Sequence, residues 1–466
     1  MKFKVIELGP IRQAEFEVGD LTTISGLNNT GKTYITHAMF GFLDFFEQHF
    51  DIPLSNEKFS ALLRDGKVVI DLKKIHDDRN RHAARAAQSY SKEIAEIFGS
   101  SETRFEQTQI EVSELPRNTK LRGNEYRTRW GTKERPVVEV RKEAGSTDLI
   151  VSLLIETEAE DTAPVDFSRH FISRAIKDVV FDGVIPKPFI SSAERTGAAI
   201  FQKELDFTRN RLIEVLGDKN AKFSPFDLLS PFKGKYPVAV RKNVDFIREL
   251  GSITHRTSFL LRDHVEVLDG FKEIIGGEYA VDKDGDVQYL PASSRVKLAL
   301  VESSSSVRSL LDIGFYLRHL ARPGDLLVVD EPELNLHPEN QRRIARLFAQ
   351  LVNLGIRVFM TTHSDYIIKE FNTLLMLNQK HTHLTQLMRD EGYGDGELLS
   401  ASRVRSYMAM KDKIVLDWNV RRSTCLTLVP ATISQESGIE LQSFDETIEE
   451  MNRIQDAIVW GGDERD

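Results

Sequence analysis

Eight residues near the amino end of this 466-residue chain have the types and spacing needed to hold a nucleoside triphosphate. Residues 26–33, Gly-Leu-Asn-Asn-Thr-Gly-Lys-Thr, fit the phosphate-loop pattern G-x-x-x-x-G-K-[ST] at every fixed position. Glycine lets such a loop turn tightly enough for its backbone N–H groups to wrap the phosphates. Lys32 would reach the β- and γ-phosphates, and the Thr33 hydroxyl would hold Mg²⁺. The residues expected to bind the nucleotide are Gly26, Asn28, Asn29, Thr30, Gly31, Lys32 and Thr33.

The flanking sequence predicts the strand and the helix that a phosphate loop requires. Residues 21–25 are a short run rich in β-branched side chains. Downstream, apolar residues recur at helical spacing, at Ile35, Met39, Phe42, Leu43 and Phe46. We therefore expect strand, loop and helix in that order. A glycine-rich turn without a ligand is the alternative at this point.

Two apolar strands in the second half of the chain end in residues that could act on the same nucleotide. Residues 326–331 run Leu-Leu-Val-Val-Asp-Glu, as expected of a buried parallel strand whose carboxyl end faces a ligand. Asp330 would complete the Mg²⁺ shell, and Glu331 would polarise the attacking water. Residues 356–362 form a second such strand, followed by His363, which could bind the γ-phosphate or orient the water. A solvated acidic turn and a capping histidine are the alternatives.

Two further segments are candidates for contact with phosphate. Serines 303–306 precede an apolar-periodic segment, and consecutive serines at a helix start offer hydroxyls and free N–H groups to an anion. Such a run can also be a simple cap or linker. Arg195 follows a predicted buried strand over residues 188–192. It could sense the γ-phosphate, or it could form a local salt bridge with Glu194.

Composition bounds the class of protein. The chain is 41% apolar and 29% charged, and no apolar run approaches the roughly 18 residues that a membrane span needs. The first residues carry no signal-peptide core, so we expect a cytoplasmic protein without a membrane partner. The one cysteine, Cys425, excludes an intrachain disulfide. The net charge of −9 argues against a protein that coats nucleic acid, but it allows a local basic patch.

The best nucleic-acid candidate in the sequence is the basic segment 117–135. Tyr126 and Trp130 lie within it, and the only acids are Glu125 and Glu134. Because cations neutralise phosphates and aromatic rings stack on bases, this segment could contact DNA or RNA, although the net charge of the chain opposes that interpretation. A solvated hairpin is the alternative. Its basic residues are Arg117, Lys120, Arg122, Arg127, Arg129, Lys133 and Arg135.

Four motifs follow one another in the order and spacing of the ABC-type ATPases, and the chain resembles that family. The motifs are GLNNTGKT, ESSSSVRS, LLVVDEPELNLHP and TTHSD. Within the family the chain is similar to the soluble branch that includes RecF, the SMC-like repair ATPases and the overcoming-lysogenisation-defect (OLD) proteins of bacterial phage defence. The resemblance covers about residues 1–47 and 285–375. It implies an α/β fold, an ABC-type P-loop ATPase head, with ATP and Mg²⁺ as ligands.

The resemblance assigns a role to each motif. Residues 26–33 become the Walker A loop and residues 334–337 the D-loop. Asp330 and Glu331 become the Walker B pair, with Asp330 as a metal ligand beside Thr33 and Glu331 as a catalytic residue. His363 becomes the switch histidine, a second catalytic residue.

The signature motif is the part of the resemblance that departs most from the family. Residues 303–306 fall at its place, and Ser304 and Ser305 would touch the γ-phosphate held by a second subunit. The glycine pair that normally follows the signature serine is replaced by serine, and no convincing glutamine loop is present. Both departures argue against a membrane-transporter subunit.

The resemblance implies a function and an assembly. An ABC-type site is complete only when the signature of one subunit caps the nucleotide of another, so we expect a homodimer or higher homo-oligomer. We expect ATP-driven closure to act on a separate effector protein or on DNA, in bacterial anti-phage defence. The alternatives are a RecF-type DNA repair or recombination ATPase, an OLD-like nuclease and a slow-turnover ATP-dependent scaffold.

The resemblance and the composition together predict a discontinuous core. The ATPase core would take residues 1–47 and 276–400, with parts of 137–197. Residues 48–136 would form a mixed α/β insertion, residues 198–275 a helical insertion, and residues 401–466 a segment that packs on the core or on a partner.

Two features of the carboxy-terminal part concern whether the chain has its own nuclease domain or acts through a partner protein. The acids that a nuclease domain would need, Asp390, Glu391, Asp395 and Glu397, lie in a glycine-rich segment that we interpret as a solvated loop. Residues 444–458 place five apolar residues on one helical face, which predicts a packing or partner helix.

Overall fold

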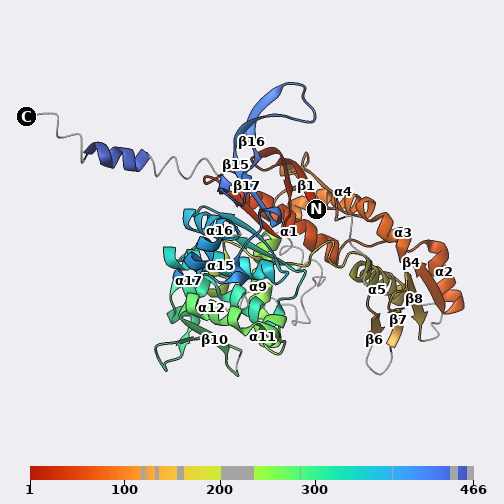
Figure 1. Ribbon diagram of the computed structural model, residues 1–466. Helices are drawn as coiled ribbons and strands as arrows, with labels where there is room; N and C mark the ends of the chain where they lie inside the picture. The colour runs from red at the N-terminus through yellow and green to blue at the C-terminus, as the bar shows by residue number, and fades with distance from the viewer. Residues whose placement is uncertain are drawn as a thin grey trace, which may run out of the picture.

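The computed structural model describes residues 1–116, 121, 123–131, 136–154, 162–200, 236–283, 285–379, 381–440 and 450–458. Its centre is a six-stranded sheet in the order β16-β15-β3-β14-β13-β9 (Figure 1). Neighbouring strands from β15 to β9 are parallel, and β16 is antiparallel to β15. The strands are β3 (Leu21–Ser25), β9 (Pro188–Ser191), β13 (Leu326–Asp330), β14 (Arg357–Thr362), β15 (Val404–Val415) and β16 (Arg422–Pro430).

The three middle strands form because their residues are apolar or β-branched and can be buried on both faces. Every residue of β3 and β13 is buried. The register pairs Thr362 with Ser25, and Asp330 with Thr361. The carboxyl ends of β3, β14 and β13 therefore lie side by side at one edge of the sheet, where the predicted motifs begin.

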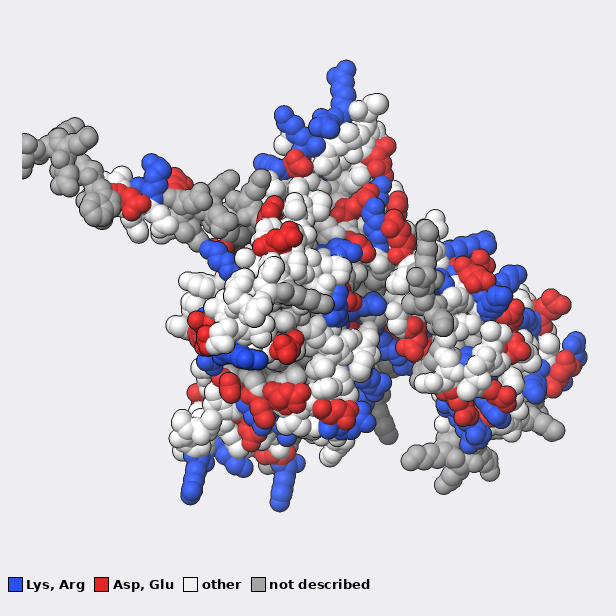
Figure 2. All heavy atoms as spheres, viewed as in Figure 1, with Lys and Arg blue, Asp and Glu red and all other residues white. Residues whose placement is uncertain are grey.

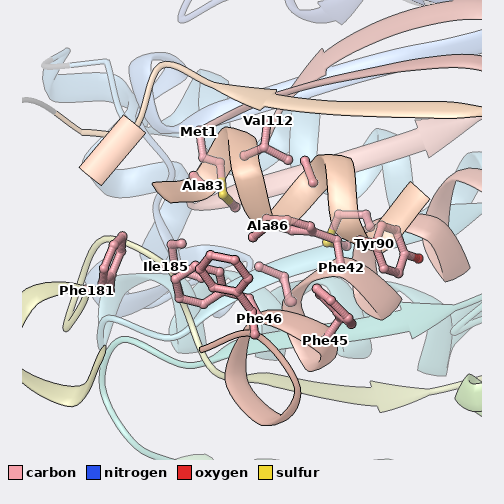
Figure 3. Close-up of a cluster of buried hydrophobic side chains, with 14 of the residues drawn as sticks. Met1, Phe42, Phe45, Phe46, Ala83, Ala86, Tyr90, Val112, Phe181 and Ile185 are labelled. Atoms are coloured by element: carbon pink, nitrogen blue, oxygen red, sulfur yellow. The ribbon is translucent and has the colours of Figure 1, made fainter. Parts of the chain in front are cut away.

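Helices cover both faces of this sheet. Side chains alternate along the strands, so that Val328 joins one hydrophobic core and Val329 joins the other. The first core includes α1 (Lys32–Gln48) and α4 (Arg79–Ile97), whose rings and alanines interlock around Phe42, Phe46 and Tyr90 (Figure 3). The second core includes α12 (Val265–Ile275), α15 (Pro338–Asn353) and α16 (Asp365–Leu377). The expected α/β class is confirmed.

A three-stranded antiparallel sheet packs on the first core. Its order is β2-β1-β5, and the Phe3 ring stacks on Phe16 at 5.2 Å between centroids and meets the edge of Phe42 at 5.5 Å. Its strands are β1 (Lys2–Leu8), β2 (Ile11–Glu17) and β5 (Gln109–Ser113).

A second small unit extends from the body, at the right of Figure 1. It is a four-stranded antiparallel sheet in the order β4-β8-β7-β6, with helices around it. Lys177 ties this unit to α1, because its Nζ donates to the carbonyl oxygens of Phe46, Glu47 and Phe50, each at 2.8 Å. The elements are α2 (Asn56–Asp65), β4 (Lys67–Asp71), α3 (Leu72–Asp77), β6 (Tyr126–Gly131), β7 (Pro136–Lys142), β8 (Asp148–Leu153) and α5 (Thr162–Val180), whereas η1 (Glu102–Arg104) lies beside α4.

Short helices and small sheets complete the described chain. Residues 450–458 are helical and stand away from the body in Figure 1, with Met451, Ile454 and Ile458 exposed. Phe444 and Ile448, predicted on the same helix, lie outside the described residues. The remaining elements are α6 (Arg195–Ile200), α9 (Val238–Arg248), α10 (Leu250–Ile253), α11 (Phe259–Asp263), β10 (Gly277–Val281), β11 (Val287–Pro291), β12 (Leu298–Ala299), η3 (Leu300–Glu302), α13 (Ser305–Ser309), α14 (Leu311–Phe315), η4 (Tyr316–Leu320), α17 (Thr382–Asp390), η5 (Asp395–Glu397), η6 (Ala401–Arg403), β17 (Thr432–Ser434) and β18 (Gly438–Glu440).

A search of the described helices for a membrane span found none that is both long and apolar enough.

Candidate nucleotide site

The phosphate loop joins the end of β3 to the start of α1 through two glycines in conformations that other residues rarely adopt. Gly26 has φ +139° and Gly31 has φ +93°. A Cβ on Gly26 would lie 2.5 Å from the carbonyl oxygen of Ala409, and a Cβ on Gly31 would lie 2.8 Å from Ile11 Cγ1. Both positions therefore require glycine for backbone conformation and for space.

The Lys32 side chain bends back toward the start of the phosphate loop. This side chain is buried, and its Nζ donates to the carbonyl oxygens of Gly26 at 3.1 Å and Leu27 at 2.9 Å. Burial lowers the pKa of Lys32, and the negative charges of Glu331 and Asp330 act in the opposite direction. The fold thus holds one buried cation at the position where the pattern expects the phosphates.

The other loop residues differ in their exposure. Asn28 and Asn29 are exposed, and Asn29 has φ +63°. Thr30 Oγ1 donates to the Leu27 carbonyl oxygen at 2.8 Å, which tightens the turn. Thr33 is half-buried in the first turn of α1.

Asp330 offers a free oxygen at the end of β13. The residue is 1% exposed, and its Oδ1 accepts a hydrogen bond from Thr361 Oγ1. Its Oδ2 is buried without a hydrogen-bond partner among the described residues. A buried carboxylate oxygen without a partner is costly, and Mg²⁺ prefers hard oxygen ligands. Asp330 and the Thr33 hydroxyl therefore fit Mg²⁺, which would be held with water and phosphate oxygens.

Glu331 is held in a strained backbone conformation beside His363. Its φ is +53°, and its N–H donates to both the carbonyl oxygen and Oγ1 of Thr361 at 3.2 Å. Glu331 Oε1 lies 3.5 Å from His363 Nε2. Non-glycine residues with positive φ cluster at functional sites because the surrounding contacts must enforce the strain. The structure thus brings the two predicted catalytic side chains together.

The pKa values of this pair shift toward each other. Burial raises the pKa of Glu331, and the nearby Asp330 carboxylate raises it further. Burial lowers the pKa of His363, and the positive charge of Lys32 adds to this effect. A neutral imidazole beside a carboxylate with raised basicity is an arrangement that can accept a proton from water.

Glu333 is a site residue that the sequence pattern did not single out. Its Oε2 accepts from Thr362 Oγ1 at 3.0 Å, and its Oε1 accepts from the His363 N–H at 2.5 Å. Burial raises the pKa of Glu333. This carboxylate fixes the end of β14 and with it the histidine. The available signal was a third acid two residues after Glu331.

Arg195 plays neither role proposed from the sequence. The residue is 1% exposed, and its guanidinium donates to four backbone carbonyl oxygens rather than to Glu194 or toward a ligand. The acceptors are those of Ser192 at 2.9 Å, Ser309 at 2.7 Å, Asp330 at 2.6 Å and Glu331 at 2.8 Å. Arg195 therefore clamps the end of β13 to α13 and to the residue that follows β9. The sequence could not reveal this because the partners are backbone atoms distant in the chain.

The serine segment caps its own short helix. Ser304 is the N-cap of α13, and its Oγ accepts from the Val307 N–H at 3.3 Å. Ser304 and Ser305 are both exposed. Ser309 Oγ donates to the Leu334 carbonyl oxygen at 3.2 Å, so the segment is joined to residues 334–337. Contact with the nucleotide of a second subunit stays a prediction.

The basic segment 117–135 is largely neutralised where the structure describes it. Arg127 Nη2 lies 2.7 Å and Arg129 Nε lies 2.6 Å from one oxygen of Glu139 on β7. Tyr126 donates to Asp178 at 3.1 Å, so its hydroxyl is held against α5. Arg117, Lys120, Arg122, Lys133 and Arg135 lie outside the described residues.

Glu397 departs from the solvated loop expected for the carboxy-terminal acids. It is 6% exposed and accepts from Arg346 Nη2 at 2.9 Å, Gln350 Nε2 at 3.1 Å and the Gly394 N–H at 3.0 Å. Its role is to anchor this segment on α15. Across the described residues, no cluster of three or more His, Cys, Asp or Glu side chains is placed to hold a metal ion.

Comparison with known proteins supports the class of this site. Residues 202–368, roughly a third of the chain, match the AAA ATPase domain family. The matched part contains the serine segment, Asp330, Glu331 and His363 but not the phosphate loop. No curated protein matches the chain.

Solved structures that are similar to this chain include SMC heads. An SMC head bound to the C-terminal winged-helix domain of ScpA is 10% identical, with 92% of this chain and 97% of that chain covered and a TM-score of 0.33. The SMC head domain from Thermotoga maritima is 10% identical, with 93% and 98% covered and a TM-score of 0.29. The SMC head from Pyrococcus furiosus, bound to the C-terminal domain of ScpA, is 11% identical, with 97% and 98% covered and a TM-score of 0.33.

The phosphate loop and the parallel sheet give the chain the fold of a P-loop ATPase, and its residues 202–368 match the AAA ATPase domain family.

Proposed function

We propose that this chain binds ATP with Mg²⁺ and hydrolyses it by activating water with Glu331. The observation that carries the proposal is the position of Glu331 Oε1, 3.5 Å from His363 Nε2, one residue after a buried Asp330 with a free oxygen. Phosphate-transfer sites work by positioning and by electrostatic stabilisation, and these residues supply both.

Each side chain has a defined task in this proposal. Lys32 would exchange its two loop carbonyl acceptors for β- and γ-phosphate oxygens, which are stronger charge-assisted acceptors. Glu331 would accept the proton of the attacking water, and His363 would orient that water or the γ-phosphate. Thr33 and Asp330 would hold Mg²⁺, which neutralises phosphate charge when it is bound.

We further propose that hydrolysis requires at least two copies of the chain. Ser304 and Ser305 are exposed, so they are accessible to a nucleotide held by another copy. The resemblance of the motifs to ABC-type ATPases supports a head-to-tail dimer in which this segment closes the partner's site.

We propose that closure acts on a separate effector or on DNA in phage defence, as the motif resemblance to the OLD branch suggests. The exposed apolar residues Met451, Ile454 and Ile458 support an effector protein, because an unpacked apolar helix face is costly in water. Cells that carry the chain with its neighbouring genes should resist phage, and Lys32→Ala should remove that resistance. Equal phage titres on cells with and without the chain would contradict this role.

The purified protein with Mg²⁺, ATP and plasmid DNA tests the proposed reaction. We expect phosphate release and intact plasmid. Nicked plasmid would favour a nuclease, and bound but uncleaved ATP would favour a scaffold.

The phosphate loop has its own test in the Lys32→Ala variant. Removal of this buried cation should weaken ATP binding by at least about a hundredfold, because charge-assisted bonds to two phosphates are lost. Calorimetric titration with ATP measures the change, and Lys67→Ala, which removes an exposed lysine, is the control. An unchanged affinity for ATP would remove Lys32 from the site.

A further inference from the structure

The β15–β16 hairpin carries a basic surface that the ATPase site does not use. Residues 410–426, which we call the basic ribbon, form the outer part of this hairpin. β15 pairs with β3 only from Val404 to Met408, so the basic ribbon continues beyond the central sheet. It is at the top of Figure 1, and Figure 2 shows Lys and Arg atoms gathered at its end.

One face of the basic ribbon is turned outward. The register pairs Val415 with Arg422, and Lys413 with Thr424, and residues two apart on a strand share a face. On β16 exposure follows the same alternation, because Arg422 and Thr424 are exposed whereas Ser423 and Cys425 are half-buried, and on β15 both Lys411 and Lys413 are exposed. Lys411, Lys413 and Arg422 are therefore three exposed cations on the outward face. Arg421, exposed in the connecting loop, is a fourth cation at its end.

These four cations are not neutralised by the protein. Within the described residues, none of Lys411, Lys413, Arg421 and Arg422 forms an ion pair. This is the opposite of Arg127 and Arg129, which share the Glu139 carboxylate.

The two acids of the basic ribbon are directed elsewhere. Asp412 pairs in register with Cys425, on the other face. Asp417 forms an ion pair with Lys4 and accepts from Gln13 Nε2 at 3.0 Å, so its charge is taken up by β1 and β2. The charges of the outward face are thus all positive.

We propose that the basic ribbon binds duplex DNA by lying in the major groove. That groove admits a two-stranded β-ribbon, and three cations on one face match the phosphates on its two sides. The inference deepens the proposed function, since it names DNA as a partner, but the binding does not depend on ATP turnover.

The shape and composition of the ribbon favour DNA over other anionic partners. A-form RNA has a deep, narrow major groove that excludes a ribbon, so duplex RNA should bind more weakly. A membrane surface would require an apolar face. On the outward face the exposed large apolar residue is Val415, Leu426 is half-buried against the first core, and Trp418 and Val420 lie in the loop.

Fluorescence anisotropy of a short labelled DNA duplex tests the proposal without nucleotide. We compare the wild-type chain with the triple variant Lys411→Glu, Lys413→Glu, Arg422→Glu. The variant should bind at least about tenfold more weakly, and the slope of log affinity against log salt should fall by about two to three, because each phosphate contact contributes about 0.9. Duplex RNA of the same sequence should bind the wild type more weakly than DNA.

A charge-matched control separates this surface from net charge. Lys283→Glu, Arg295→Glu, Lys297→Glu changes the charge equally at exposed positions around β10 and β11, at the bottom of Figure 1. It should keep wild-type affinity and salt slope. A neutral variant, Lys411→Gln, Lys413→Gln, Arg422→Gln, removes the same charges without reversing them. Thermal melts of all variants show whether each one is folded.

Several outcomes would overturn the proposal. The first is an equal loss of DNA affinity in the ribbon variant and in the charge-matched control, and the second is no binding of duplex DNA by the wild type. The others are duplex RNA bound as tightly as DNA, and anionic vesicles bound more tightly than DNA. Phosphate release by the glutamate variant, measured separately without DNA, should equal that of the wild type. A wild-type protein that binds DNA but releases no phosphate would defeat the ATPase proposal and leave this one standing.

Discussion

At the scale of single residues, the site is defined by groups whose environments are unfavourable without a ligand. The Oδ2 atom of Asp330 is buried without a partner among the described residues, and Glu331 holds a positive φ. Lys32 is buried against two carbonyl oxygens. Each of these features lowers the free energy of unfolding when no ligand is bound, and a bound nucleotide and metal would restore it. This supports a role for these residues in ligand binding rather than in folding.

The pH dependence of turnover should report Glu331. Its carboxylate must be ionised to accept a proton, and burial beside Asp330 raises its pKa above the ordinary value of about 4.3. The rate should therefore be constant near neutral pH and fall as the pH drops toward this raised pKa. Protonation of His363 should not lower the rate in that range, because burial lowers the pKa of the imidazole and keeps it neutral to lower pH. Steady-state phosphate release across pH, beside ATP binding at the same pH values, measures this.

The His363→Gln variant is the control for that assignment. It should turn over more slowly but keep the acid limb at the same pH. If the limb disappears in this variant, the titrating group is the imidazole and not Glu331.

At the scale of elements, Arg195 joins three segments that the reaction depends on. It binds the residues that end β13, a residue of α13 and the residue that follows β9. Helix α13, which follows the serine segment, and residues Asp330 and Glu331 are therefore parts of one hydrogen-bonded unit, so a displacement of one would displace the other.

Arg195→Met should destabilise the protein and slow hydrolysis. Buried carbonyl oxygens would lose a charged donor, which costs on the order of 3 kcal/mol. Thermal melts should show a lower Tm, and phosphate release should fall more than ATP affinity, since Lys32 is untouched. Arg262→Met, at an exposed arginine, is the control and should match the wild type. Equal Tm values for the two variants would mean that the clamp is not required.

The elements show how far the sequence predicts this structure. The apolar runs at 21–25, 326–330 and 356–362 predicted the three middle strands, because parallel strands buried on both faces are continuous in hydrophobicity. β15 and β16 lack such a run beyond Ala409, since the outer residues of β15 are mostly exposed and those of β16 alternate between exposed and half-buried. The extension of the sheet was therefore not evident from the sequence.

The site was predictable for the same reason, in part. Asp330 ends its strand, Glu331 and His363 follow theirs, and Lys32 follows the loop that leaves β3. The ends of these neighbouring parallel strands lie at the same edge of the sheet. Arg195, Glu333 and Ala409 act through backbone atoms of distant segments, and no local pattern marks such contacts.

At the scale of the whole molecule, the site and the basic ribbon are adjacent. The carbonyl oxygen of Ala409 packs on Gly26, and Lys411 follows two residues later on the same strand. ATP binding and DNA binding would thus share β15. Assembly would add a second copy, whose serine segment would complete the nucleotide site.

Blocking the serine segment should separate nucleotide binding from hydrolysis. Ser304→Arg with Ser305→Arg places two bulky cations at exposed positions of α13, while the phosphate loop keeps its structure. ATP affinity should stay within about threefold of wild type, and phosphate release should fall at least about a hundredfold. Radiolabelled ATP binding and a phosphate-release assay give the two values, with Ser306→Ala as a mild control. Wild-type hydrolysis in the arginine variant would reduce the segment to a helix cap.

The most direct test of the account is the Glu331→Gln variant incubated with Mg²⁺ and ATP and followed by light scattering and phosphate release together. The substitution keeps the size of the side chain but leaves an amide that cannot accept the proton of the attacking water, so hydrolysis should fall by about a hundredfold to ten-thousandfold. ATP that binds only the closed assembly stabilises it, so the molecular mass should double with ATP and stay unchanged without it. Phosphate release at the wild-type rate by this variant would contradict the assignment of the catalytic base and, with it, the site described for this chain.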